Sequence, residues 1–132
     1  MKETRKHLSF AIIPRKVLDS FNSKIESRAL RVFNVLTMYY SVFYDEYTEE
    51  TMLNRPFIGH NRIAKILNIS KSQVKIDLKI LSNIEDEDGV PILVIHNRFD
   101  KEENRYLSNV YELPQVEEIL KNFKTRFEFW HR

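Results

Sequence analysis

The stretch from His60 to Asn83 constrains the fold more than any other part of the chain. Two amphipathic segments are separated there by the short break Asn68-Ile69-Ser70. Ser70 can accept a hydrogen bond from a free first-turn amide, and Gln73 can reach back, so the pair predicts a capping box. Asn68 tolerates the left-handed backbone conformation that a sharp turn requires. We therefore expect two helices, over about residues 61–67 and 71–82, joined by a tight turn.

Two faces run along the second predicted helix. At 100° per residue, Val74, Leu78 and Leu81 share one side, which is the pattern of a core-facing stripe. A row of lysines at i, i+4 and i+8 occupies a neighbouring side, where like charges repel unless an anion lies beside them. Such a row can be a solvated face or a phosphate-binding surface, and the capped turn and the hairpin described below favour the second. The row consists of Lys71, Lys75 and Lys79.

The distribution of charge is more informative than its total. The formal net charge of the 132 residues is +2, but between His60 and Leu81 five cations accompany a single anion, Asp77. Many of the acidic residues lie in two runs, near residues 45–50 and 85–88. A basic patch is therefore offset by acidic loops.

Composition sets the remaining bounds. Hydrophobic residues make up 42% and charged residues 30% of the chain, which are globular values for a length that fits one domain. The absence of cysteine excludes disulfides and cysteine-based zinc sites. There is no secretory signal pattern and no apolar run long enough to cross a bilayer, so we expect a cytoplasmic protein with no membrane partner.

A long helix over about residues 24–44 should form the spine of the core. Its apolar and aromatic side chains recur at helical spacing, and Ser23-x-x-Glu26 predicts a second capping box at its start. The other elements of the first half are weaker predictions from local pattern. They are a strand or arm over residues 7–13, a short helix opened by Pro14 with Val17, Leu18 and Phe21 inside, a loop over residues 45–55, and a short strand at Phe57–Ile58.

Two strand-like runs follow the two-helix stretch. Residues 91–99 and 105–113 are rich in β-branched and aromatic residues and flank a charged tip at 100–104, which predicts a hairpin. The acidic run before them, residues 85–88, lacks the ligand pattern of a calcium loop, so we expect a solvated loop that turns at Asp88-Gly89. Three cations lie near the hairpin tip, where they can meet a nucleic-acid backbone or minor groove: Arg98, Lys101 and Arg105.

Pro114 opens a final amphipathic helix that extends to about Trp130. Its apolar stripe can pack on the domain core or form a homodimer through residues 114–130, and the sequence leaves both open. We therefore divide the chain into a domain over residues 1–113 and a helix within 114–132. The stripe consists of Val116, Ile119, Leu120, Phe123, Phe127 and Trp130, and the polar face of Glu117, Glu118, Lys121, Lys124 and Arg126.

The order of elements resembles the winged helix-turn-helix plan, and in particular the domains of bacterial plasmid and phage replication initiation proteins. The residues that carry the resemblance are F-A-I-I-P-R-K-V-L (10–18), R-I-A-K-I-L-N-I-S-K-S-Q-V-K-I-D-L-K-I-L (62–81) and N-V-Y-E-L (109–113). The resemblance implies a mainly α fold with a small β-hairpin wing. The helix-turn-helix would occupy residues 60–83 and the wing residues 91–113, with a short strand and helix before them and the amphipathic helix after.

This resemblance implies binding to double-stranded DNA, with the second helix of the unit in the major groove. The chemistry of the side chains agrees, because Gln73 can pair with adenine, Ser72 can bond a base or a phosphate, and lysines bind phosphate or guanine. A replication initiator domain or a small transcriptional regulator, acting as a dimer, would use such a surface. The expected contact residues are Arg62, Lys65, Lys71, Ser72, Gln73, Lys75 and Lys79, with Arg98, Lys101 and Arg105 from the wing.

Patterns that carry catalysis are nearly absent. The four histidines are scattered without a close pair, and there is no glycine-rich phosphate loop. We therefore expect no enzymatic activity, no metal, no cofactor and no small-molecule ligand. Asp77 lies beside the apolar face of its helix, and we expect it to form a structural ion pair with Arg62.

Two isoleucines support a second hypothesis, a protein-interaction module that does not read DNA. Ile76 and Ile80 lie beside the lysine row, at positions that are commonly polar in the family. Exposed, they would make an apolar patch suited to a protein partner. If the hairpin or the last helix covers them, the DNA-binding interpretation is favoured instead.

Overall fold

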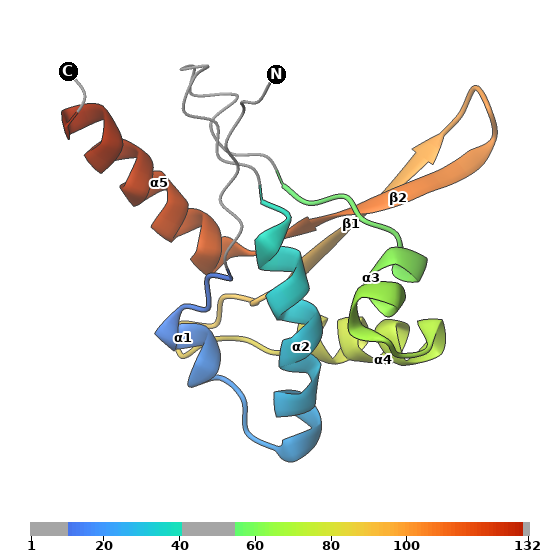
Figure 1. Cartoon of the computed structure of the whole chain (residues 1–132), viewed down its shortest axis with the longest axis horizontal. Coiled ribbons are helices and arrows are strands. Elements are labelled where there is room, and N and C mark those ends of the chain that lie inside the picture. Colours follow the sequence, from blue (N-terminus) through green and yellow to red (C-terminus); the bar gives the residue numbers. More distant parts are fainter. Residues whose placement is uncertain (1–10, 41–54, 131–132) are drawn as a thin grey trace.

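The computed structural model describes residues 11–40 and 55–130, with side chains up to residue 122. Within these residues, five helices accompany one two-stranded antiparallel sheet (Figure 1). The predicted combination of a helical fold with a small β-hairpin is confirmed at this level. The elements are α1 (Arg15–Leu18), α2 (Lys24–Met38), α3 (His60–Leu67), α4 (Lys71–Ser82), β1 (Val94–Asp100), β2 (Arg105–Glu112) and α5 (Pro114–Trp130).

Helix α2 is the spine of the core, as its periodicity predicted. Ser23 Oγ accepts a hydrogen bond from the backbone N–H of Glu26 at 3.1 Å. The Glu26 carboxylate in turn accepts from the N–H of Asn22 at 2.8 Å, one residue before the N-cap. The Ser23 half of the predicted capping box therefore forms, whereas Glu26 reaches back one residue beyond the N–H that the box requires. Two otherwise free donors are satisfied at the start of the helix.

Helix α2 ends at Met38, earlier than the predicted end at Tyr44. The N–H groups of Tyr39 and Tyr40 each bond to a carbonyl only three residues back, at 3.1 and 3.3 Å, so the last turn tightens and stops. Thr37 contributes, because its hydroxyl bonds to the Asn34 carbonyl at 2.8 Å and accepts the N–H of Ile12 at 3.2 Å. Residues 41–44, like most of the predicted loop over 45–55, lie outside the described residues.

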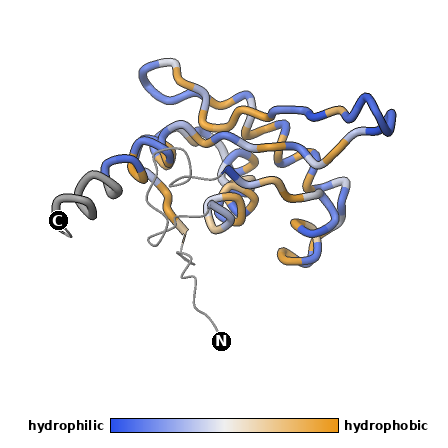
Figure 2. Tube along the Cα trace, turned by 90° about the horizontal axis from the view of Figure 1, so that it is seen from above, coloured by the Kyte–Doolittle hydropathy of each residue, from blue (hydrophilic) through white to orange (hydrophobic). Residues whose placement is uncertain are grey.

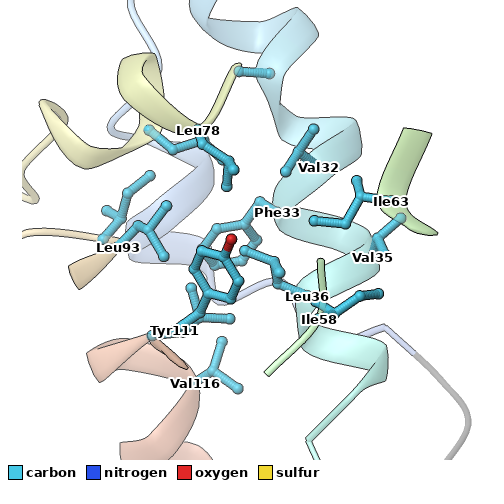
Figure 3. Packing of buried hydrophobic residues seen from close by; sticks show 14 of the residues in the cluster. Val32, Phe33, Val35, Leu36, Ile58, Ile63, Leu78, Leu93, Tyr111 and Val116 are labelled. Atoms are coloured by element: carbon cyan, nitrogen blue, oxygen red, sulfur yellow. The ribbon is translucent and has the colours of Figure 1, made fainter. Parts of the chain in front are cut away.

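The core forms where α2 meets the other elements (Figure 3). Tyr111 of β2 points at Phe33 and Leu36 of α2, and all three are fully buried. Burial of one large apolar side chain contributes roughly 1.5–3 kcal/mol, so a cluster of this kind stabilises the fold substantially. The buried residues around it come from the remaining elements and the linking segments: Val17, Ile58, Ile63, Leu78, Leu93 and Val116.

Two predictions for the first half of the chain are wrong. Of the expected inner face of the short helix, Val17 is buried and Phe21 is half-buried, but Leu18 is 47% exposed because α1 makes only about one turn.

Phe57–Ile58 is not a strand. Only the carbonyl of the preceding Pro56 bonds to the free edge of β2, at 2.9 Å to Tyr111 N, and proline has no N–H to extend such a ladder. Of the strand or arm predicted over residues 7–13, the strand is absent from residues 11–13, and residues 7–10 lie outside the described residues.

The hairpin forms as predicted, with a register irregularity in its middle. Val94 to His96 pair with Glu112 to Val110, whereas Arg98 pairs with Leu107, so two residues of β2 oppose Asn97 of β1. Such a bulge bends a hairpin and increases its twist. In Figure 1 the hairpin and α5 extend from opposite sides of α2.

The loop after α4 was expected to be solvated, but one of its acidic side chains is buried and hydrogen-bonded. The expected turn at Asp88-Gly89 is confirmed, with Gly89 at φ 79°. Asp86, however, is buried: its Oδ1 accepts the N–H groups of Asp88 and Val90, and its Oδ2 accepts Gln115 Nε2 of α5 at 3.0 Å. The hydrogen bonds from Gln115 and from the backbone lower the pKa of Asp86.

A buried polar network joins α2, β2 and α5. The Tyr40 hydroxyl accepts the N–H of Leu113 at 2.9 Å and donates to Glu117 Oε2 at 2.7 Å. Burial and the hydrogen bond to Glu117 raise the pKa of Tyr40 well above its ordinary value. Arg55 completes the network with two bonds to the Glu117 carboxylate, at 2.7 and 3.1 Å. The prediction that Glu117 lies on the solvent face is therefore wrong, because these partners compensate its burial.

Replacing Tyr40 with phenylalanine should lower the free energy of unfolding by about 1–3 kcal/mol, because the buried N–H of Leu113 loses its acceptor. Urea denaturation measures the change. Tyr39→Phe is the matched control, since the Tyr39 hydroxyl bonds only the exposed Arg62 among the described residues, at 3.2 Å. We expect it to change stability by less than about 0.5 kcal/mol. Equal losses in the two variants would contradict the assignment.

Candidate functional site

The turn between α3 and α4 forms as predicted. Asn68 adopts the left-handed conformation, with φ 56° and ψ 47°, and the N–H of Ile69 bonds to the Ala64 carbonyl at 3.0 Å. Ser70 is the N-cap of α4, and its hydroxyl accepts the N–H of Gln73 at 3.0 Å. These local bonds fix the angle at which α4 leaves the turn and hence the direction of its exposed face.

The other half of the predicted capping box does not form. The Gln73 side chain donates from Nε2 to Asp77 Oδ1 at 2.9 Å, one helical turn further along, instead of reaching back. Asp77 is completely buried and pairs through Oδ2 with Arg31 Nε of α2, also at 2.9 Å. The expected ion pair of Asp77 is therefore present, but its partner is Arg31 and not Arg62.

The lysine row of α4 is exposed, and its charge is not neutralised. No described carboxylate lies within ion-pair distance of Lys71, Lys75 or Lys79. On α3, Lys65 likewise has no such pair, and Arg62 bonds only the neutral hydroxyl of Tyr39 at 3.2 Å. We call these five cations the basic face: Arg62, Lys65, Lys71, Lys75 and Lys79.

Two lysines of the basic face act on the neighbouring His60. Burial lowers the pKa of His60, and the positive charges of Lys75 and Lys71 lower it further. Several cations elsewhere do have acidic partners, such as Lys16, whose ammonium lies 3.1 Å from Asp88 Oδ2. The basic face is thus a region of positive potential that the neighbouring side chains do not cancel.

An open groove of about 310 Å³ lies between α4 and the hairpin. Its α4 wall carries Lys75 and Lys79, and its hairpin wall carries the amides of Asn97 and Asn109. Strand alternation already places Asn109 on the face of Tyr111, but no local signal marks Asn97, which lies opposite the bulge. The remaining lining residues are His60, Leu78, Ser82 and Ile95.

Two of the three hairpin cations are less available than those of α4. Arg98 donates from Nε to the Ser108 carbonyl at 2.7 Å, and its guanidinium lies 5.6 Å from the centre of the Phe57 ring. Arg105 lies 3.5 Å from Glu103, and Lys101 is exposed in the turn. The tip is hydrophilic and points away from the helices (Figures 1 and 2). Residues 98–105 hold as many acids as cations, so the tip adds no net positive charge.

The two isoleucines of α4 differ in their surroundings. Ile80 is half-buried and packs against the core, whereas Ile76 is 49% exposed. On the helix, Ile76 follows Ser72 by one turn and lies next to Lys75 and Lys79 in the exposed arc. Of the two outcomes left open for these residues, Ile80 is covered and Ile76 is exposed, so a single apolar side chain lies within the cationic surface of α4.

Helix α5 begins against the core. Val116 and Leu120 are buried, whereas Ile119 of the same predicted stripe is 40% exposed. The side chains of residues 123–130 lie outside those described. The first turns of α5 therefore belong to the domain, and a dimer through residues 114–130 stays a prediction.

No protein-family model matches the chain, and no curated protein or solved structure matches it. Within residues 11–40 and 55–122, whose side chains the structure describes, no group of three or more His, Asp or Glu side chains is placed to hold a metal ion. None of the described helices combines the length and apolar character needed to span a membrane. The basic face and the adjoining groove are the strongest candidate site.

Replacing Arg31 with methionine should destabilise the fold, because Asp77 would remain as a buried carboxylate without its cation. We expect a loss of about 3 kcal/mol, at the lower end of the usual cost of breaking a buried pair, because the Arg31 side chain is 30% exposed. Chemical denaturation measures it. Arg28→Met on the same helix is the control, since Arg28 is exposed, and it should change stability by less than about 0.5 kcal/mol. Similar effects in both variants would argue against the ion pair.

Proposed function

We propose that the chain binds double-stranded DNA as a winged helix-turn-helix protein, with α4 in the major groove and the hairpin as the wing. The observation that carries the proposal is the basic face, whose five cations have no carboxylate partner among the described residues. Like charges at helical spacing repel one another, and a row of phosphates removes that repulsion while releasing counterions. DNA is the anionic partner whose charges repeat along such a surface.

The dimensions of α4 are compatible with this arrangement. A helix with its side chains is about 10–12 Å wide, and the major groove is about 12 Å wide. Lys71, Lys75 and Lys79 lie on successive turns and span about 12 Å along the helix axis. Ser72 is exposed between them, where its hydroxyl can bond a base or a phosphate. The lysines would then hold the backbone while α4 faces base edges.

The biological role follows from the resemblance to replication initiation proteins. A replication initiator domain or a small transcriptional regulator in the cytoplasm would use this surface on repeated or palindromic half-sites. Two copies joined through α5 would present two α4 helices to neighbouring half-sites. An electrophoretic shift with the replication origin, or with the DNA upstream of the gene, tests this role directly.

Salt dependence tests the DNA-binding proposal. About five phosphate contacts predict a slope of about −4.5 for log K against log salt concentration. Lys75→Gln should weaken binding to all duplexes alike and reduce the slope by about one contact. Lys24→Gln is the matched control, because Lys24 is exposed at the start of α2 and should leave the slope unchanged. A wild-type protein that binds no duplex at low salt would exclude the proposal.

The pH dependence of binding gives an independent test through His60. Its pKa is lowered in the free protein by burial and by Lys75 and Lys71. Phosphates beside these lysines would cancel their charge and raise that pKa, so binding would take up a proton. Affinity should then rise as the pH falls below about 6.5, by up to about tenfold for a one-unit pKa rise. Isothermal titration at several pH values measures it.

The controls for this test are two histidine variants. His60→Gln should remove the pH dependence, whereas His96→Gln should keep it, because His96 lies on the hairpin and bonds to Glu112 at 2.8 Å. A pH dependence that persists in His60→Gln would show that another group takes up the proton.

Exposure of Ile76 among the lysines favours a second candidate function, binding to a protein with an acidic and apolar surface. The salt titration separates the two candidates. Binding to a protein partner without any affinity for duplex DNA would support the second and exclude the first.

A further inference from the structure

Ile76 is the feature of α4 that phosphate binding does not explain. Its side chain is 49% exposed, whereas Ile80, one turn further along, packs on the core. Exposed apolar surface that is surrounded by cations gains nothing from phosphate, which is anionic and hydrated. A partner that satisfies the whole face must present an apolar group between its charges.

The structure also narrows which side chains can read bases by hydrogen bonding. A two-pronged contact with adenine needs the amide N–H and the amide oxygen of Gln73 to be oriented toward the base. In the structure Gln73 Nε2 donates to Asp77, and Asp77 is held in turn by Arg31. The amide is thus fixed by its own helix, and the base-reading role assigned to Gln73 is weakened.

We propose that Ile76 reads the C5-methyl group of a pyrimidine in the major groove, on thymine or 5-methylcytosine. The inference rests on the proposed DNA-binding function and specifies its base preference. The thymine methyl is the apolar feature of the major-groove edge, and apolar side chains recognise it. Ile76 occupies the arc of α4 that also carries Ser72, Lys75 and Lys79. When the lysines hold the phosphates, Ile76 therefore faces base edges.

The first experiment needs no variant. Duplexes that the wild-type protein selects from a random library are resynthesised with deoxyuridine in place of thymine, one position at a time. This exchange removes one methyl group and leaves every hydrogen-bonding group in place. Loss of one methyl contact should weaken binding about fourfold at one or two positions. Fluorescence anisotropy at fixed salt concentration measures the dissociation constants.

Two variants assign the methyl contact to Ile76. Ile76→Ser should bind the thymine and deoxyuridine duplexes equally. Ile66→Ser is the matched control, because Ile66 is exposed to nearly the same extent, 47%, but lies on α3. It should keep the full discrimination. Urea denaturation of both variants checks that each folds as the wild type does.

The possible outcomes separate this inference from the proposed function. Wild-type binding that ignores the thymine methyl at every position overturns the inference and leaves DNA binding intact, as does discrimination that persists in Ile76→Ser. No binding to any duplex overturns both. At the sensitive position, tighter binding to 5-methylcytosine than to cytosine shows that the methyl of either base is read, and equal binding assigns the contact to thymine alone.

Discussion

A buried carboxylate determines how the two-helix unit is attached to the rest of the molecule. Asp77 lies on the inner side of α4, is excluded from water, and is held by Arg31 of α2 and Gln73 of its own helix. A buried ion pair adds little net stability, but it strongly disfavours arrangements in which either charge lacks its partner. The pair therefore specifies how α4 is rotated against α2. The outward direction of the lysine row follows from that rotation.

A second polar network fixes the other end of α2. Tyr40, Glu117 and Arg55 join the end of this helix to the start of α5, and the Tyr40 hydroxyl also accepts the backbone N–H that follows β2. Between the two networks lies the apolar cluster around Tyr111, Phe33 and Leu36. Apolar packing supplies most of the stability, and it tolerates small changes of orientation. The polar contacts at both ends of α2 restrict the orientation of the helices that pack against it.

The features predictable from sequence are those specified by neighbouring residues. The Ser70 cap, the left-handed Asn68 and the lysine row each depend on residues within two turns of helix. The contacts that fix the architecture join residues 46 positions apart, for Arg31 and Asp77, and 77 apart, for Tyr40 and Glu117. No periodicity identifies such partners. The candidate site divides in the same way, because the cations follow from spacing, whereas the different exposure of Ile76 and Ile80 depends on packing.

The hydrogen bonds of Asp86 connect the loop that follows α4 to α5, a helix that begins only at Pro114. One oxygen of its carboxylate holds the turn that leaves α4, and the other holds Gln115 in the first turn of α5. The Asp86 side chain therefore links the segment that follows α4 directly to the first turn of α5. A shift of Gln115 would have to break its bond to Asp86 or carry that segment with it.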